Sequence, residues 1–109
     1  MRLVIVESPY AGDVEQNVRY ARAALADSLA RGEAPIASHL LYTQPGVLRD
    51  HDPAERALGI AAGLAWGRVA DATVIYADLG ITPGMQQGIE RAQNEGRECE
   101  IRRIGWDAS

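Results

Sequence analysis

The chain has 109 residues, of which 47% are hydrophobic and 24% charged, and its formal net charge at pH 7 is −4. This length allows one globular domain, and we expect residues 1–109 to form it, because a second hydrophobic core needs more chain. The composition excludes a disordered chain, and the acidic balance argues against a nucleic-acid-binding protein, which presents a basic face. A small anionic ligand held by backbone amides and one or two arginines is compatible with this charge.

The single cysteine, Cys99, excludes an internal disulfide framework and a zinc site built from several cysteines, and we expect neither a metal nor a cofactor. Cys99 lies in an alternating, strand-like segment, which favours packing over a nucleophilic role. The apolar run in MRLVIVES is too short for a signal peptide, and no stretch approaches the roughly 18 apolar residues of a membrane span. We therefore expect a cytoplasmic protein without a membrane partner.

Strand-like runs alternate with helical patterns from the N-terminus onward. Residues 2–7 (RLVIVE) predict a strand that ends before Pro9. A helix is expected over 14–31, where apolar residues recur at steps of three and four, with Asp13 as its N-cap and Gly32 as its stop. A weaker strand over 34–38 and a loop over 42–52 follow.

The second half continues this alternation. Asp52-Pro53 predicts the start of a helix that runs to about residue 70. Gly59, Gly63 and Gly67 weaken that helix but permit close packing on a sheet or on another subunit. A strand over 72–77, a helix over 83–95 and a strand over 98–103 complete the pattern, which predicts an α/β fold, a flavodoxin-like three-layer sandwich with a four- to five-stranded, mainly parallel sheet. Because a domain of this size buries a limited share of its surface, we also expect a homo-oligomer.

Ligands of an open parallel sheet bind outside the carboxyl ends of its strands, and the loops of this chain at those ends carry suitable groups. After the first strand, SPYAGD offers the Ser8 hydroxyl, the Tyr10 ring and the flexible Gly12 amide, or it forms an ordinary strand-to-helix turn. After the second strand, His39 either hydrogen-bonds a ligand or caps the strand. Arg56, early in the following helix, either binds an anion or belongs to a solvated face.

The segment after the third strand, DLGITPG, carries the strongest indication of an anion site. The Thr82 hydroxyl and the amides of Gly84 and Met85 would lie at a helix N-terminus, where partial positive charge favours phosphate. In the alternative interpretation, Thr82 caps the helix and Pro83 takes its first position. A capping threonine and a phosphate-binding threonine use the same geometry, so the pattern leaves both open.

Taken together, these segments resemble the small nucleoside 2-deoxyribosyltransferase-like proteins, including a phage and bacterial branch whose members begin with SPY-x-GD. The resemblance spans residues 8–96 and is carried by SPYAGD, G-x-x-P-x-x-x-HL, DPAER, an Ala-Asp pair before the third strand, and LGITPGM…GIERA…G. It implies a flavodoxin-like, usually oligomeric domain that binds nucleosides or nucleoside monophosphates at the strand ends. Related N-glycosidases cleave the bond between base and deoxyribose.

The resemblance holds for the binding residues. The family's phosphate loop and N-terminal loop are matched by Thr82, Pro83, Gly84, Ser8, Tyr10 and Gly12. It fails for the catalytic ones. The family's nucleophilic glutamate would fall at Gly88, eight residues before Gly96, and its second carboxylate, expected shortly before Asp71, is absent as far back as Glu55.

Attack on the anomeric carbon needs a carboxylate nucleophile, and departure of the base needs an acid. Glu90 is a poor substitute, because it faces about 200° away from position 88 on an ideal helix. Asp78 and Glu7, at strand ends, are the remaining replacements.

Three functions remain open. The first is a non-catalytic nucleotide-binding protein, in which Gly88 and the small residues near Ala65 enlarge the pocket beyond a monophosphate. Its sharpest form is a phage-type protein that sequesters a nucleotide second messenger of host defence. The alternative is a nucleotide N-glycosidase or deoxyribosyltransferase that uses a relocated carboxylate, and a structural or regulatory role without a ligand is the third reading.

Overall fold

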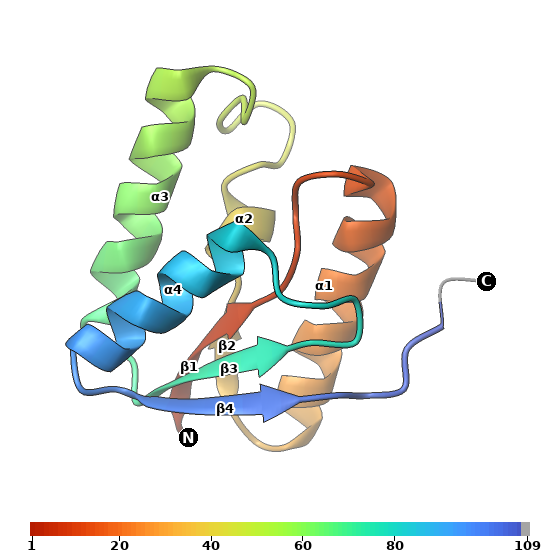
Figure 1. Cartoon of the computed structure of the whole chain (residues 1–109), viewed down its shortest axis with the longest axis vertical. Helices are drawn as coiled ribbons and strands as arrows, with labels where there is room; N and C mark the ends of the chain where they lie inside the picture. The colour runs from red at the N-terminus through yellow and green to blue at the C-terminus, as the bar shows by residue number, and fades with distance from the viewer. Residues whose placement is uncertain (108–109) are drawn as a thin grey trace.

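The computed structural model describes residues 1–107 and contains a four-stranded parallel sheet (Figure 1). In chain order the elements are β1 (Leu3–Glu7), α1 (Val14–Ala30), β2 (Ala34–Ile36), α2 (Ser38–Leu41), α3 (Pro53–Gly67), β3 (Ala72–Tyr76), α4 (Pro83–Asn94) and β4 (Glu98–Arg102). The strands lie in the order β2-β1-β3-β4, so the chain moves outward from β1 to one edge and from β3 to the other. The predicted α/β class with a parallel sheet is confirmed.

Helices cover both faces of the sheet, with α4 in front of it and α1 behind it in Figure 1. The face toward α1 holds the larger core, in which Val4, Val6 and Val74 pack around Tyr20 of α1. On the other face Ile75 packs against α4. Because β3 is buried along its whole length, it reads as a continuous apolar run, as expected for a central parallel strand.

The helices begin at the residues that their capping side chains predict. The Asp13 carboxylate accepts a hydrogen bond from the Gln16 amide at 3.1 Å, and Asp52 accepts one from the Ala54 amide at 2.9 Å. Gly32 follows α1 with a φ of 81°, which a residue with a side chain rarely adopts. Within residues 1–107, no helix is long and apolar enough to cross a membrane.

Two boundaries differ from the prediction. The strand expected over 34–38 ends at Ile36, and α2 begins at Ser38 in a stretch where no helix was expected. The helix expected to reach residue 70 ends at Gly67, after which two tight turns lead into β3. These turns bring Asp71 under β1, where its carboxylate accepts a hydrogen bond from the Leu3 amide at 2.8 Å. The hydrogen bond between Asp71 and Leu3 is a tertiary contact, which the local sequence pattern does not reveal.

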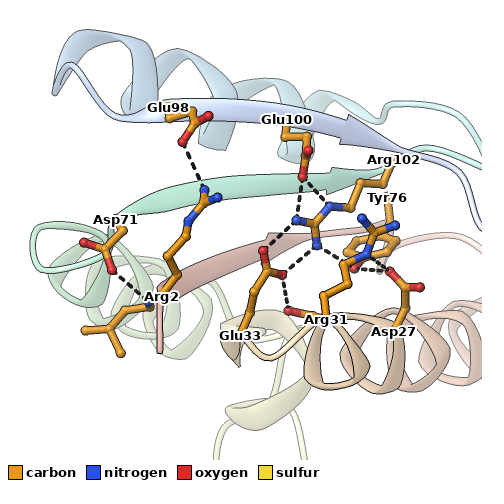
Figure 2. Close-up of polar contacts among 11 residues, drawn as sticks. Arg2, Asp27, Arg31, Glu33, Asp71, Tyr76, Glu98, Glu100 and Arg102 are labelled. Atoms are coloured by element: carbon orange, nitrogen blue, oxygen red, sulfur yellow. Dashed lines mark hydrogen bonds and ion pairs between the residues drawn. The ribbon is translucent and has the colours of Figure 1, made fainter.

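Charged side chains on the α1 side of the sheet form the network shown in Figure 2. The Arg102 guanidinium donates hydrogen bonds to Glu33 at 2.7 and 2.8 Å and to the Tyr76 hydroxyl at 3.0 Å. Tyr76 in turn donates to Asp27 of α1 at 2.8 Å. The hydrogen bond from Arg102 lowers the pKa of Glu33 to about 2. This network ties β4 to α1 and seals that face, which leaves the opposite face to carry an open site.

Candidate functional site

A cleft of about 660 Å³ opens between α3 and α4, on the sheet face opposite α1. Ile5 and Glu7 of β1 form part of its floor, and α3 and α4 provide its walls. The helix α2 contributes Ser38 and His39, and Tyr42 follows directly after it. The cleft lies where the strand order reverses between β1 and β3, which is the usual ligand position in an open α/β sheet. Its volume falls within the range of small-molecule sites.

Seven of the eight residues selected from the sequence line this cleft. They are Ser8, Tyr10, His39, Arg56, Thr82, Gly84 and Met85. The exception is Gly12, which lies outside the lining and adopts a φ of 100° in the turn before α1. Gly12 therefore shapes the loop that carries Ser8 and Tyr10. Asn17 holds the same loop, because its side-chain amide donates to the Tyr10 carbonyl at 2.9 Å.

Ser8 and His39 form a pair at the carboxyl end of β1. The Ser8 Oγ lies 2.6 Å from the Nε2 of His39, and Ser8 is 4% exposed. Burial lowers the pKa of His39 to about 4, so the imidazole is neutral at pH 7. A neutral imidazole both donates and accepts hydrogen bonds, and the pair can orient an uncharged polar group of a ligand.

The start of α4 combines a helix cap with a free amide. Thr82 Oγ1 accepts a hydrogen bond from the Met85 amide at 3.2 Å, so the predicted capping role is present. The Met85 side chain is buried in the core on this face, and its sulfur accepts from the Thr82 amide at 3.4 Å. Gly84 lies in the first turn, where amides lack acceptors within the helix. The Gly84 amide and the Thr82 hydroxyl are thus the groups best placed to meet an anion.

Glu7 places a carboxylate inside the cleft. A Cβ added to Gly88 would lie 2.2 Å from Glu7 Oε2 and 2.9 Å from Oε1, so the carboxylate fills the space beside Gly88. The expectation that Gly88 enlarges the pocket is wrong, because Glu7 occupies the space beside it. Of the small residues near Ala65, Gly63 and Gly67 line the cleft, whereas Ala65 itself is exposed outside the lining. Burial raises the pKa of Glu7 to about 7, while Arg97 acts in the opposite direction.

Asp78, the other replacement carboxylate considered from the sequence, has a structural task. It accepts hydrogen bonds from the Tyr20 hydroxyl at 2.6 Å and from the amides of Ile104, Gly105 and Trp106 at 2.9 to 3.3 Å. Asp78 therefore anchors the segment that follows β4, and it is not part of the cleft lining. Glu90 lies on the cleft rim, is exposed, and contacts Gln86 at 3.5 Å.

The sequence analysis missed two arginines of the cleft, Arg91 and Arg97. Arg97 is held by the Thr73 hydroxyl at 3.0 Å and by the Gly67 carbonyl at 2.6 Å, and its side chain is 7% exposed. It joins the C-terminal end of α3 to β3 beneath the cleft. No local pattern marks an arginine before a strand as part of a site, so its role emerges only from the fold.

The glycines of α3 allow close approach within the chain itself. A Cβ on Gly63 would lie 2.5 Å from Ser38 Oγ of α2, and one on Gly67 would lie 3.1 Å from an Arg97 nitrogen. One on Gly59 would lie 3.2 Å from Leu48. The packing partners of this glycine row are therefore α2, the following loop and Arg97.

Among residues 1–107, no group of three or more histidine, cysteine or acidic residues is arranged to hold a metal. A family model described as "Domain of unknown function (DUF7768)" matches residues 2–102. Comparison with curated proteins gives no match.

Among solved structures, that of a 2-deoxyribosyltransferase from the psychrotolerant bacterium Bacillus psychrosaccharolyticus is similar, with a TM-score of 0.66 and 17% sequence identity. The similarity covers 96% of this chain and 75% of that chain. At this identity the likeness shows the fold alone, and it confirms the flavodoxin-like fold class. The narrower SPY-x-GD branch stays a prediction.

Proposed function

The chain belongs to the DUF7768 family, and we propose that it is a nucleotide-binding protein built on the fold of a 2-deoxyribosyltransferase. One observation carries the proposal: four separate segments, after β1, in α2, in α3 and at the start of α4, bring seven residues selected for nucleotide chemistry to one cleft. Convergent polar groups in a largely preformed cleft are typical of a small-molecule site.

The charges of the cleft give the nucleotide an orientation. Its phosphate would lie at the start of α4, near the Gly84 amide and the Thr82 hydroxyl, because a helix N-terminus favours anions. Arg56 lies on the cleft lining and adds a positive charge. The Tyr10 ring offers a stacking surface for the base, and the neutral Ser8–His39 pair offers hydrogen bonds to uncharged groups.

The biological form that we favour is sequestration of a nucleotide second messenger, of the type that phage proteins direct against host defence. Position 88, where the resembling enzymes carry their nucleophile, is a glycine, which supports binding without turnover. A protein of this kind acts by lowering the free concentration of its ligand. Homo-oligomer formation would multiply the sites per particle.

A nucleotide screen tests the proposal. Thermal shifts are measured for nucleoside mono-, di- and triphosphates and for cyclic mono- and dinucleotides, and each ligand that stabilises the protein is recovered and chromatographed. We expect at least one class to raise the midpoint of unfolding, since a ligand of the native state stabilises it by mass action, and to return intact. Absence of a shift across the panel at millimolar concentration contradicts nucleotide binding.

The placement of Glu7 favours a second candidate, a nucleotide N-glycosidase or deoxyribosyltransferase. Its carboxylate stands beside Gly88, which takes the place of the family's glutamate. In the hydrolase, a Glu7 oxygen would bond to the anomeric carbon as the bond to the base nitrogen breaks and that nitrogen takes a proton from water. The hydroxide left by that water would then add to the anomeric carbon and release the Glu7 carboxylate, giving free base and sugar phosphate. Free base from a deoxynucleotide, lost in Glu7→Gln and kept in the exposed control Glu15→Gln, would establish this activity over sequestration.

A further inference from the structure

The Glu7 carboxylate has no partner inside the protein. None of the hydrogen bonds and ion pairs within residues 1–107 includes it, and Arg97 influences it only through longer-range attraction. The side chain is half-buried and accepts no hydrogen bond within the protein, and ionisable groups of a cleft with a shifted pKa are concentrated at functional sites. Because Glu7 faces the cleft, its missing donors are expected to come from a ligand.

Glu7 ends β1, and its carboxylate lies beside the middle of α4, which determines the part of a nucleotide that it can contact. Both carboxylate oxygens lie against Gly88, which is one helical turn after Gly84. Four residues of helix advance about 6 Å along the axis. The sugar hydroxyls of a nucleotide are only a few covalent bonds of about 1.5 Å from the 5′-phosphate, whereas the base edge lies beyond the sugar. A phosphate at the start of α4 therefore places the sugar over Glu7.

We propose that Glu7 accepts hydrogen bonds from the 2′- and 3′-hydroxyls of a ribonucleotide, so that the cleft prefers ribonucleotides to 2′-deoxyribonucleotides. This inference rests on the nucleotide-binding function proposed above. Both oxygens of an ionised carboxylate accept hydrogen bonds, so one carboxylate can accept from two neighbouring hydroxyls at once. The base of the same nucleotide lies beyond the sugar, so its hydrogen-bond donors would be out of reach of Glu7.

Removing one hydroxyl removes one hydrogen bond to a charged group and leaves part of the carboxylate unpaired. We expect a 2′-deoxyribonucleotide to bind about tenfold to a hundredfold more weakly than its ribonucleotide, and a 2′,3′-dideoxyribonucleotide more weakly still. A site built to hydrogen-bond a hydroxyl rejects the analogue that lacks it more strongly than an apolar pocket rejects a missing methylene.

Calorimetric titration tests this order. Adenosine, guanosine, cytidine and uridine 5′-monophosphates and their 2′-deoxy and 2′,3′-dideoxy counterparts are titrated into the full chain at pH 8, where Glu7 is ionised. The expected result is a stepwise loss of affinity with each hydroxyl removed, for whichever base binds best. Equal affinities of the ribo, 2′-deoxy and 2′,3′-dideoxy forms of the same nucleotide overturn the inference and leave nucleotide binding intact. Binding by none of these monophosphates overturns it as well, while the wider screen above decides the proposed function separately.

Variants assign the preference to Glu7. Glu7→Gln keeps the size of the side chain and is expected to bring the ribose preference below about threefold, because a neutral acceptor gives a weaker hydrogen bond. Gly88→Ala places a methyl group where the carboxylate lies, and we expect the same loss. Glu15→Gln, an exposed change of equal charge on α1, should keep the preference. A ribose preference that survives both Glu7→Gln and Gly88→Ala, or a change in base preference alone, overturns the inference.

Discussion

Two facing residues, Glu7 and Gly88, define the chemistry of the cleft. The carboxylate and a side chain at position 88 exclude each other, because a Cβ on Gly88 would lie 2.2 Å from Glu7 Oε2. The carboxylate at this point of the cleft therefore comes from β1 in the sheet floor, and Gly88 of α4 leaves the space that it fills. A group fixed by β1 is held more rigidly than one on a loop, which suits a residue that must meet a ligand at a defined distance.

Glu7 should make the ligand-free protein less stable at alkaline pH. Its pKa rises from 4.5 to about 7 on folding, so the folded state binds its proton more tightly than the unfolded state. That contribution is fully present below about pH 4.5 and is lost as the pH rises through about 7. One pKa unit corresponds to about 1.4 kcal/mol. The free energy of unfolding of Glu7→Gln minus that of the wild type should therefore be up to about 3 kcal/mol larger at pH 8 than at pH 4. Urea titrations at the two pH values measure this difference. A stability difference between variant and wild type that is the same at both pH values would contradict the raised pKa of Glu7.

Thr82→Ala separates the two roles of the threonine. Loss of the cap to the Met85 amide should cost about 1 kcal/mol of unfolding free energy. If the hydroxyl also contacts the phosphate, nucleotide affinity should fall roughly tenfold to a hundredfold, since a hydrogen bond to a charged group is lost. Chemical unfolding and ligand titration measure the two effects, and Thr82→Ser is the control that should keep both. Unchanged affinity with reduced stability would leave Thr82 as a cap alone.

At the scale of secondary-structure elements, the sequence predicts what local rules decide. Asp13, Asp52 and Thr82 mark helix starts because their side chains satisfy amides within the same few residues. The short helix α2 and the early end of α3 escape prediction, since packing and the Asp71–Leu3 hydrogen bond determine them. The site follows the same division. Residues such as Ser8, Tyr10 and Thr82, which line the cleft, could be selected in advance from their loops, whereas Arg97 joins the cleft only through the approach of distant segments.

The ion pair between Glu33 and Arg102 links the segment after α1 to β4, and breaking it should be costly. Both side chains are largely buried, at 9% and 4% exposed. Glu33→Gln removes two hydrogen bonds to the buried guanidinium, while Glu100 remains paired with Arg102. The variant should therefore lose about 1.5–3 kcal/mol of unfolding free energy at pH 7. The control is Glu98→Gln, which breaks an exposed pair with Arg2 and should cost at most about 1 kcal/mol.

Acid unfolding checks the same pair. The pKa of Glu33 is lowered from 4.5 to about 2 in the folded state by its hydrogen bond from Arg102. Its stabilising contribution is therefore present above about pH 4.5 and lost as the pH falls toward 2. The stability difference between the wild type and Glu33→Gln should shrink across that window. A difference that stays constant from pH 6 to pH 2.5 would mean that the carboxylate is not held by the arginine.

At the scale of the whole molecule, the two faces of the sheet differ in how they are closed. The α1 face is sealed by a packed core and by the charged network of β4, whereas α3 and α4 leave an open cleft on the other face. The helix α3 carries one wall of that cleft, yet Gly67 is the only buried residue within it. A helix that is apolar around most of its circumference is normally buried. The outer surface of α3 therefore exposes apolar side chains that no other part of the described chain covers.

This surface predicts a homo-oligomer. Leu58 is 61% exposed and Trp66 is 46% exposed, and α3 carries no charge after Arg56, so two copies of an acidic chain can meet here without opposing charges. Light scattering at high micromolar concentration should give at least twice the 11.8 kDa mass of one chain. Leu58→Glu should shift the protein toward the monomer while it stays folded, because burying an unpaired charge at the contact is unfavourable. Leu29→Glu, at a residue 57% exposed on α1, is the matched control and should leave the mass unchanged. A wild-type monomer under these conditions, or loss of assembly in the control alone, would contradict assembly through α3.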